Sequence, residues 1–514
     1  MNRTPLPCEG RGRGRGKPPI DLSRLITAIN ATPHQDAAGI NITGIAYDSR
    51  RVQQGALFIA VPGFHVDGHD FVRQAGAAGA AAVVVRHGRA ADFGKLSVPV
   101  LAVEDTRVAL SAAAAEFYGH PGRAMRVIGV TGTDGKTTTT YLISALLESA
   151  GKQTGLIGTV DFKVGPEWRH NDTRQTTPEA LEVQQLLAEM RDAGVTHAVV
   201  ESSSHGLELR KLDHCAYDVA VVTNVGQDHL ELHGTPDAYL AAKGRLFAFL
   251  DDRAGKPATA AGIVNADDVR SAEYMRSRTH APILSYGIDA VADVRADDLF
   301  LDASGASFIL TTPTGSVPVR IQLPGRFNVS NALAAATVAL VEGVDLPVIA
   351  AGLTEARGVP GRMERIDAGQ PFTVIVDYAH TGPAFEKVLR TLRPLTSGRI
   401  ITVFGCAGGR SPERRPGMGG VAAYLSGFSI LTNEDPHEED PRSILDDIAA
   451  AMRAAGRRED DDFTIVEDRR NAIRTAFALA RPGDVVLLAG KGHEQSIIVG
   501  RTKHPWDERT VALQ

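Results

Sequence analysis

Short apolar runs alternate with longer amphipathic segments along most of this 514-residue chain. The apolar runs are rich in β-branched residues and end at glycine or polar residues, which is typical of buried strands. Strands that alternate with helices form a largely parallel sheet, so the pattern predicts an α/β fold. The predicted strands are 55–61, 79–85, 126–130, 197–203, 217–224, 262–265, 372–376, 400–404, 429–432 and 484–488.

Helices and one hairpin complete the predicted central sheet. Residues 141–150 and 236–250 each predict a helix. Residues 307–311 and 316–322, split by Pro-Thr-Gly, predict a β-hairpin added to that sheet.

Glycine and proline clusters at 119–122 and 358–361 divide the chain. The length exceeds what one hydrophobic core holds, so we expect three α/β domains, at 20–122, 123–357 and 358–514. The Gly/Arg tract at 9–17 has no apolar segment behind it, which predicts a disordered tail (1–19) and no secretion signal. RNA binding by this tract is the less favoured interpretation.

Composition narrows the class of protein. A hydrophobic content of 43% with 23% charged residues is typical of a globular protein, and a net charge of −6 argues against nucleic-acid binding. The three cysteines have no metal-ligand or disulfide spacing, which favours a reducing cytoplasm. Since no apolar run approaches the roughly 20 residues that cross a bilayer, we expect no membrane insertion.

The segment 129–140 lies between a predicted strand and a predicted helix and has the pattern of a phosphate-binding loop. Glycines let backbone N–H groups and the helix N-terminus face an anion, while Lys136 adds a positive charge and Thr137 a hydroxyl for Mg²⁺. Val130 stands where the general pattern has glycine, so an ordinary glycine-rich turn is the alternative. The order of strand, loop, Lys-Thr and helix favours nucleoside triphosphate binding.

Polar residues also follow the next predicted strands. Glu201 and His205 suit a Mg²⁺ site or a phosphate relay, against the alternative of a solvated strand end. His229 and His233 could bind zinc, but no third ligand has suitable spacing, and polar packing around the nucleotide is preferred. Lys243, taken alone, is interpreted as a solvated lysine on a helix.

The third predicted domain repeats the design of a strand followed by glycines. Asp377 and His380 follow one strand and could hold Mg²⁺ or a ribose. Glycine-rich turns at 405–410 and 490–494 follow two others. Ligands gather at the carboxyl ends of such strands, so these turns predict a site for an anionic substrate.

Six motifs in this order resemble the Mur ligase family, from about residue 40 to the C-terminus. They are Gly129-Val-Thr-Gly-Thr-Asp-Gly-Lys-Thr137, Glu201-Ser-Ser-Ser-His205, Asn265-Ala-Asp-Asp268, Gly361-Arg-Met-Glu364, Asp377-Tyr-Ala-His-Thr381 and Gly490-Lys-Gly-His-Glu494. The resemblance implies a UDP-binding first domain, a central phosphate-loop ATPase domain with a parallel sheet, and a Rossmann-like third domain.

The resemblance also implies a reaction in peptidoglycan precursor synthesis. ATP would phosphorylate the D-Glu γ-carboxylate of UDP-MurNAc-L-Ala-D-Glu, because a carboxylate is a poor electrophile without a leaving group. The amine of a free amino acid would attack the acyl phosphate, and phosphate would leave a tetrahedral intermediate. The implied cofactors are ATP and Mg²⁺, and we expect a monomer.

Residue roles follow from the same resemblance. The implied catalytic residues are Lys136, Glu201, His205 and Lys243. The implied Mg²⁺ ligands are Thr137, Glu201 and a carbamoylated Lys243. The implied ATP-binding residues are Gly132, Thr133, Asp134, Gly135, Lys136, Thr137, Thr138, Asn265, Asp268, Asn328, Asn331, Arg362, Asp377 and His380. The implied UDP-dipeptide residues are Ser49, Thr176, Thr177, Ser203, Arg210 and Lys211. The implied amino-acid-binding residues are Arg410, Glu434, Asp435, His437, Gly490 and Glu494.

Two departures from the family pattern concern specificity. Lys211 stands where the family often has arginine, and Arg210 could replace it. Family members that add meso-diaminopimelate carry Asp-Asn-Pro-Arg where this chain has Glu434-Asp-Pro-His437. A neutral imidazole anchors a carboxylate poorly, and five acids within 434–440 favour a cationic side chain. Helix capping is the alternative, and it explains Asp440 well but Glu434 and Asp435 poorly. The hypothesis is an L-lysine or L-ornithine acceptor ahead of meso-diaminopimelate.

Two rival functions compete with this interpretation of the motifs. Another amide ligase of the superfamily, of the folylpolyglutamate or cyanophycin type, is one. Folylpolyglutamate synthases typically have Asp-Gly-Ala-His where this chain has Asp377-Tyr-Ala-His380, and the first domain has no role there. A non-catalytic ATP-binding partner protein is the other, and the intact Lys136, Glu201 and Lys243 speak against it.

Overall fold

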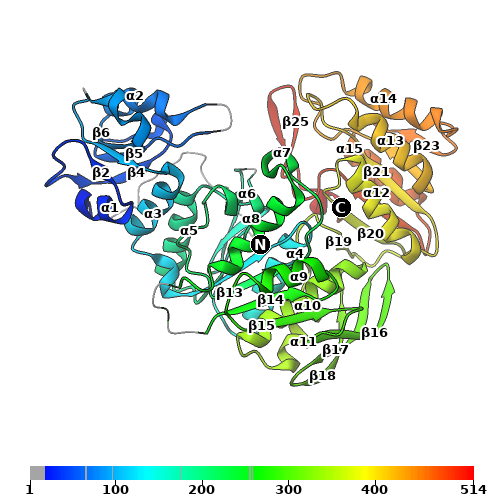
Figure 1. Ribbon diagram of the computed structural model, residues 1–514. Helices are drawn as coiled ribbons and strands as arrows, with labels where there is room; N and C mark the ends of the chain where they lie inside the picture. The colour runs from blue at the N-terminus through cyan, green and yellow to red at the C-terminus, as the bar shows by residue number, and fades with distance from the viewer. Residues whose placement is uncertain (1–17, 64–65, 95, 174, 254–255, 257–258) are drawn as a thin grey trace. The chain divides into compact units, whose positions relative to one another are not determined.

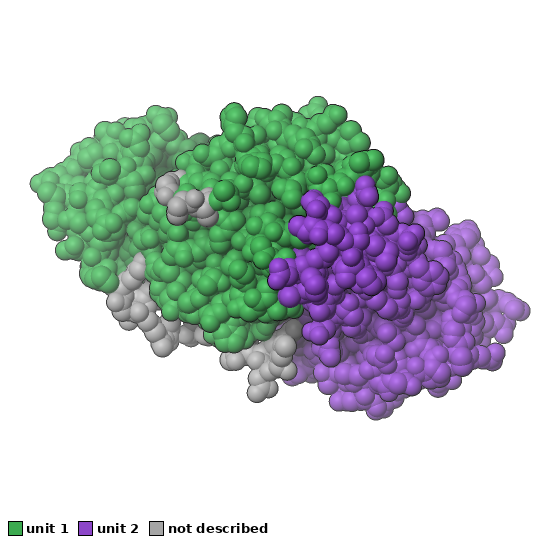
Figure 2. All heavy atoms as spheres, turned by 90° about the horizontal axis from the view of Figure 1, so that it is seen from below, with its two compact units in different colours: residues 1–293, 334–344 green, residues 294–333, 345–514 purple. Residues whose placement is uncertain are grey.

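The structure is a computed structural model that describes residues 18–63, 66–94, 96–173, 175–253, 256 and 259–514. The predicted tail therefore lies almost wholly outside the described residues. Two compact units are distinguished (Figure 2): Met1–Asp293 with Ala334–Val344, and Val294–Leu333 with Asp345–Gln514. The domain boundaries near 122 and 357 stay predictions.

The first unit begins with a five-stranded sheet of order β2-β7-β6-β5-β4, parallel except for β2 (Figure 1). The predicted strands 55–61 and 79–85 are its centre. Its strands are β2 (Thr32–Pro33), β4 (Gly44–Ala46), β5 (Ala56–Ile59), β6 (Ala80–Arg86) and β7 (Val100–Val103), beside a β1 (Ile20–Asp21) and β3 (Asn41–Ile42) pair. Its helices are α1 (Leu22–Ala28), η1 (Ser49–Arg51), η2 (Gly68–Phe71), α2 (Val72–Ala77), η3 (His87–Phe93), α3 (Thr106–Tyr118) and η4 (Pro121–Ala124).

A larger sheet follows in the first unit, with the order β11-β10-β9-β12-β8-β13-β14-β15. Its strands run parallel except for an antiparallel edge of β10 and β11 that the hydrophobic pattern did not predict. The strands are β8 (Arg126–Thr131), β9 (Thr154–Ile157), β10 (Asp161–Val164), β11 (Glu167–His170), β12 (His197–Glu201), β13 (Val219–Val222), β14 (Ala261–Asn265) and β15 (Ile283–Gly287). The helices are α4 (Lys136–Ser149), α5 (Ala180–Asp192), α6 (Ser204–Glu208), α7 (Leu230–His233), α8 (Pro236–Ala248) and α9 (Val269–Arg276).

Two local signals set where the central elements start and end. Helix α4 begins at Lys136, earlier than the predicted 141, because Gly135 (φ 82°) ends the loop directly before it. Strand β12 ends at Glu201 because the Ser203 side chain caps α6 by accepting from the Gly206 N–H. Both predicted functional residues, Lys136 and Glu201, thus lie at carboxyl ends of neighbouring strands.

Close packing fixes α8 on the central sheet. A Cβ on Gly129 of β8 would lie 2.6 Å from Leu246 Cδ1, so the glycine lets this helix approach the strand directly. Val127, Val200 and Phe247 are fully buried in the same core. Lys243 is held on this helix, one turn before Leu246.

The second unit contains three antiparallel strands and a Rossmann-like sheet. Strands β16 (Val294–Asp302), β17 (Gly305–Thr312) and β18 (Gly315–Ile321) are antiparallel, and the β17–β18 hairpin matches the predicted one. The six-stranded sheet has the order β19-β20-β24-β21-β22-β23 and is parallel except for β19.

The remaining strands are β19 (Glu364–Ile366), β20 (Thr373–Asp377), β21 (Ile400–Phe404), β22 (Phe428–Leu431), β23 (Phe463–Ile465), β24 (Val485–Ala489), β25 (Ser496–Val499) and β26 (Thr502–Pro505). The remaining helices are α10 (Arg326–Val341), which has residues in both units, α11 (Leu346–Glu355), α12 (Gly382–Leu392), η5 (Arg393–Leu395), α13 (Arg414–Leu425), α14 (Pro441–Ala454), α15 (Arg469–Leu479) and α16 (Glu508–Ala512). None of the helices in the described ranges has the length and apolarity that a membrane crossing needs.

Candidate active site

The phosphate loop joins β8 to α4 and depends on two glycines. Gly132 (φ 150°) and Gly135 (φ 82°) have positive φ, and a Cβ on Gly132 would lie 1.9 Å from Thr223 Oγ1. Lys136 Nζ donates to the carbonyl oxygens of Gly132 (3.1 Å) and Thr133 (2.8 Å). A helix N-terminus and a lysine are thus presented together, which is an anion-binding arrangement. The loop and first helical turn also hold the predicted Asp134, Thr137 and Thr138.

Glu201 connects the phosphate loop to the neighbouring strands. Its side chain is buried, and its Oε1 accepts from Thr137 Oγ1 at 2.9 Å. Its Oε2 accepts from both the backbone N–H and Oγ1 of Thr159, each at 2.9 Å. A hydroxyl and a carboxylate are held together beside the loop, and both offer the oxygen ligands that Mg²⁺ prefers.

Lys243 is buried rather than solvated, which corrects the interpretation made from its helix alone. Its Nζ donates to Gly132 O at 2.6 Å and lies 4.3 Å from the centroid of the Tyr239 ring. Burial, together with the nearby Lys136 charge, holds the pKa of Lys243 well below its usual value. A lowered pKa raises the fraction of neutral amine, which is the form that reacts with CO₂ to give a carbamate.

Three side chains near the loop form a possible metal-ligand group that sequence spacing had not indicated. Ligand atoms of His205, His229 and Glu231 all lie within 4.8 Å of one another. Burial, followed by the neighbouring His229, lowers the pKa of His205, which keeps its imidazole neutral and able to bind a metal. Glu231 supplies the third ligand of this group, which the sequence interpretation of His229 and His233 did not include.

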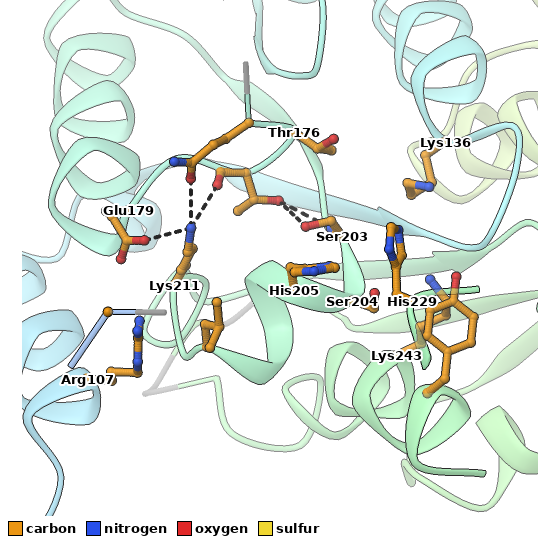
Figure 3. Close-up of a pocket in the computed structure, with 15 residues that line it drawn as sticks. Arg107, Lys136, Thr176, Glu179, Ser203, Ser204, His205, Lys211, His229 and Lys243 are labelled. Carbon is orange, nitrogen blue, oxygen red and sulfur yellow. Dashed lines mark hydrogen bonds and ion pairs between the residues drawn. The ribbon is translucent and has the colours of Figure 1, made fainter. Parts of the chain in front are cut away.

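A cavity of about 490 Å³ opens beside these groups within the first unit (Figure 3). Lys136, His205, His229 and Lys243 lie at one end, and Lys211 and Arg107 at the other. Arg107, Lys136 and Lys211 contribute positive charge to the wall, and Glu179 is the carboxylate among its described lining residues. An excess of positive charge in a concave site favours an anionic ligand.

The predicted dipeptide residues Thr176, Thr177, Ser203 and Lys211 all line this cavity. Lys211 Nζ forms an ion pair with Glu179 Oε1 (2.7 Å) and donates to Gln175 Oε1 (2.8 Å), as Figure 3 shows. Thr177 and Ser203 share a hydrogen bond of 2.9 Å.

Two other residues predicted for the dipeptide substrate lie elsewhere. Arg210 forms an ion pair with Asp213 (3.5 Å) instead of lining the cavity. Ser49, in η1, is nearly buried, and its Oγ donates to Gln74 Oε1 at 3.4 Å. Glu179 and Arg107 were missed because no local sequence signal connects them to the phosphate loop.

Several residues predicted to bind ATP form hydrogen bonds within the protein through their side chains. Asn265 Nδ2 donates to Thr223 O (2.8 Å), and Asp268 caps α9 and accepts from the Val225 N–H (2.8 Å). In the second unit, Asn331 Nδ2 donates to Asn328 Oδ1 (3.3 Å) and Asn328 Nδ2 to Pro324 O (2.8 Å). Their roles toward ATP stay predictions.

The end of β20 carries the other predicted ATP residues. Asp377 accepts from two backbone N–H groups at 2.8 Å each, and burial raises its pKa. His380 Nδ1–H donates to Tyr378 O at 2.8 Å, and burial lowers the pKa of this histidine. The Arg362 guanidinium lies 4.8 Å from the Tyr378 ring centroid. An aromatic, a guanidinium and a buried carboxyl thus share one edge of the Rossmann-like sheet.

A buried lysine neutralises part of the acidic loop (residues 434–440). Lys491 is fully buried, and its Nζ contacts Asp435 Oδ1 at 2.9 Å and Glu494 Oε2 at 2.6 Å. Asp435 Oδ1 also accepts from the Ile498 N–H at 2.8 Å. Sequence reasoning selected Gly490 and Glu494 from this motif but missed Lys491 between them.

The other acids of the acidic loop, apart from Glu434, also have protein partners. Asp440 caps α14 at Pro441, which confirms the capping alternative for that residue. The remaining ion pairs are Glu438 with Arg501 and Glu439 with Arg415. The acidic loop is therefore far less negative than its sequence suggests.

Glu434 remains as a buried carboxyl group without a partner for its Oε2. Burial raises the pKa of Glu434 to about 7. His437 beside it has φ 53°, and its backbone N–H donates to Ile498 O at 3.1 Å. Gly490 borders Glu434, while the predicted Arg410 is exposed.

A phosphate loop on a parallel sheet, a cationic cavity and a buried lysine beside the loop define an enzyme that uses a nucleoside triphosphate. Three family models match in order: the Mur ligase family catalytic domain at 41–118, the Mur ligase middle domain at 130–339, and the Mur ligase glutamate ligase domain at 361–492. The chain belongs to the Mur ligase family. It is an ATP-dependent ligase, as the motifs predicted.

Relatives match almost the whole chain. The UDP-N-acetylmuramyl-tripeptide synthetase of Roseiflexus sp. (strain RS-1) is 51% identical over 96% of this chain and 97% of that protein. The UDP-N-acetylmuramoyl-L-alanyl-D-glutamate–2,6-diaminopimelate ligase of Geobacillus kaustophilus is 45% identical over 95% of this chain and 98% of that protein. A solved structure of a ligase with that same name has 31% identity and a TM-score of 0.69, covering 95% of this chain and 97% of its own. The predicted α/β fold class is confirmed.

Proposed function

We propose that this ligase adds a diamino acid to the D-Glu of UDP-MurNAc-L-Ala-D-Glu, with ATP as the energy source. The observation that carries the proposal is the cationic cavity, which extends from the phosphate loop to Lys211 and Arg107. Such a cavity suits an elongated polyanion with one carboxylate near the phosphate loop. The names of the relatives support the same substrate class.

The reaction uses the chain's residues in distinct roles. Lys136, fixed on the phosphate loop, neutralises charge on the phosphoryl group as it moves to the γ-carboxylate. Lys211 binds a second carboxylate of the dipeptide, in competition with its present partner Glu179. Thr177 and Ser203 donate hydroxyl hydrogen bonds along the peptide. The amino acid's amine then displaces phosphate from the acyl phosphate.

The residues beside the loop fit Mg²⁺. Thr137, Glu201 and a carbamate on Lys243 offer hard oxygen ligands, and His205 and His229 add imidazole nitrogens. When bound, the ion would offset negative charge on the phosphates. The depressed pKa of Lys243 supports carbamoylation, because only the neutral amine adds CO₂.

Glu434 supports L-lysine or L-ornithine as the acceptor, ahead of meso-diaminopimelate. Its buried Oε2 accepts no hydrogen bond from the described residues, so it suits a terminal ammonium group. His437, where meso-diaminopimelate enzymes of the family carry arginine, provides no fork for a distal carboxylate. The relatives named for 2,6-diaminopimelate make that amino acid the direct competitor.

Phosphate release by the purified enzyme tests the proposal. Release should require ATP, Mg²⁺, UDP-MurNAc-L-Ala-D-Glu and an amino acid together, and L-lysine, L-ornithine and meso-diaminopimelate are compared at equal concentration. ATP hydrolysis independent of both substrates would favour a non-catalytic ATP-binding protein. Activity with a folate or aspartate polymer instead would favour the rival ligases. We further propose a cytoplasmic monomer, consistent with the free thiols of Cys215 and Cys406.

A further inference from the structure

Arg107 is a cation of the cavity wall that no sequence motif indicated. It lies in the first turn of α3, is half-buried and lines the cavity. Its Nη2 donates to the carbonyl oxygen of Pro62, and its backbone N–H donates to Asp105 Oδ1 at 2.7 Å. Among the described residues no carboxylate pairs with its guanidinium.

The other cations of the wall have different surroundings. Lys211 is neutralised by Glu179, and Lys136 donates to carbonyl groups of its own loop. Arg107 is oriented by one backbone carbonyl, which leaves further N–H groups of its rigid fork for a ligand. In Figure 3 it lies at the end of the cavity away from Lys136 and Lys243.

We propose that Arg107 binds the diphosphate of the UDP-linked substrate. This inference rests on the proposed function, in which the reacting carboxylate lies at the Lys136 end of the cavity. The diphosphate is separated from that carboxylate by the sugar and the dipeptide, so it reaches the opposite end. A guanidinium binds two oxygens of such a group at once, and a half-buried setting strengthens the contact. Arg107 thereby positions the substrate and takes no part in the chemistry.

The test compares Arg107→Gln and Arg107→Lys with the full-length wild-type enzyme. In Arg107→Gln the KM for UDP-MurNAc-L-Ala-D-Glu should rise about 10- to 100-fold. The kcat and the KM for ATP should stay within about twofold, because the residue is remote from the reacting atoms. Arg107→Lys keeps the charge without the fork, so its KM should be intermediate.

Two inhibitors distinguish a diphosphate contact from a carboxylate contact. UDP-GlcNAc has the diphosphate and no carboxylate, whereas MurNAc-L-Ala-D-Glu has carboxylates and no diphosphate. The inhibition constant of UDP-GlcNAc should rise in Arg107→Gln by the same factor as the KM, and that of MurNAc-L-Ala-D-Glu should not change. The reverse pattern, or an unchanged KM, would overturn the proposal.

Arg73→Gln is the matched control. Arg73 lies on α2 of the same part of the chain, where it donates to Asp92 O (2.8 Å) and contacts the Phe93 ring. The kcat and KM values of the Arg73→Gln variant should equal those of the wild type. If the wild type is active and Arg107→Gln has the same kinetics, only the role of Arg107 is wrong. If the wild type releases no phosphate in response to the substrates, the proposed function itself is wrong.

Discussion

The cavity of the first unit and the acidic loop of the second unit differ in how their charged side chains are paired. In the cavity, Arg107 and Lys136 line the space, and Glu179 is the carboxylate among the described lining residues. In the acidic loop, Lys491 is enclosed between Asp435 and Glu494. The first region keeps its charge for a ligand, and the second uses its charge for its own structure.

That difference indicates how each region recognises its substrate. A polyanion needs an excess of positive charge, which Lys136 and Arg107 provide at the two ends of the cavity. A small amino acid needs a rigid site with one or two unsatisfied polar groups, and Glu434, whose Oε2 has no hydrogen-bond partner among the described residues, is such a group. Removing a cation should therefore impair activity in the first region and stability in the second.

The largest effect is expected for Lys136→Ala. Loss of the loop cation should reduce kcat by about 10³-fold or more, since the phosphoryl group loses its main protein counter-charge. The thermal midpoint should change little, because Lys136 Nζ bonds to carbonyl groups that solvent can also satisfy. Substrate-dependent phosphate release and thermal unfolding measure the two quantities.

Lys152→Ala is the control for this substitution, since Lys152 lies in the turn after α4, away from the loop. A Lys136→Ala enzyme that lost stability as much as activity would remove the contrast between the two regions.

In the second unit, Lys491→Met should mainly reduce stability, whereas Lys136→Ala should mainly reduce activity. It leaves Asp435 and Glu494 without their buried counter-charge, which costs about 3 kcal/mol of stability. Asp435→Asn, which keeps the contact between Lys491 and Glu494, should cost about 1 kcal/mol. Hydrogen exchange of the β24 amides measures the loss of stability near Lys491. Equal protection in the two variants would contradict the expected difference between them.

The two regions were also not equally predictable from sequence. The phosphate loop was found because its glycines, Lys136 and Thr137 are consecutive and their chemistry is local. The contact of Asp435 with Lys491 joins residues far apart in the chain, so counting acids near His437 overstated the negative charge. Lys243 looked solvated for the same reason: its burial depends on Tyr239 and on Gly132 of the distant loop.

The strands also show that sequence patterns identify local features better than contacts that depend on the fold. Apolar runs located most of the buried parallel strands but not β7 or β9. Strands β10 and β11, which pair as an edge, were not predicted either. Arg107 and Glu179 could not be selected at all, because only the fold brings α3 and the start of α5 to one cavity.

His437→Arg probes specificity rather than stability. A guanidinium at this position provides a fork for a distal carboxylate, so the ratio of kcat/KM for meso-diaminopimelate to that for L-lysine should rise by about 30-fold. His504→Arg, at an exposed position of β26, is the control for added charge alone. An unchanged ratio would mean that the acidic loop does not contact the acceptor's side chain.

Glu434→Gln should have the smallest effect, and it is visible only as a function of pH. Because burial raises the pKa of Glu434 to about 7, its carboxyl group is mainly neutral at pH 6 and mainly ionised at pH 8. The ε-ammonium group of L-lysine stays charged over this range, so the KM for L-lysine should fall about fivefold as the pH rises from 6 to 8. In Glu434→Gln the KM should lose this pH dependence, while the KM for ATP, measured alongside, should follow the wild type. A wild-type KM for L-lysine that is constant or rises between pH 6 and 8 would remove Glu434 from the acceptor site, and the acidic loop would then be a purely structural element.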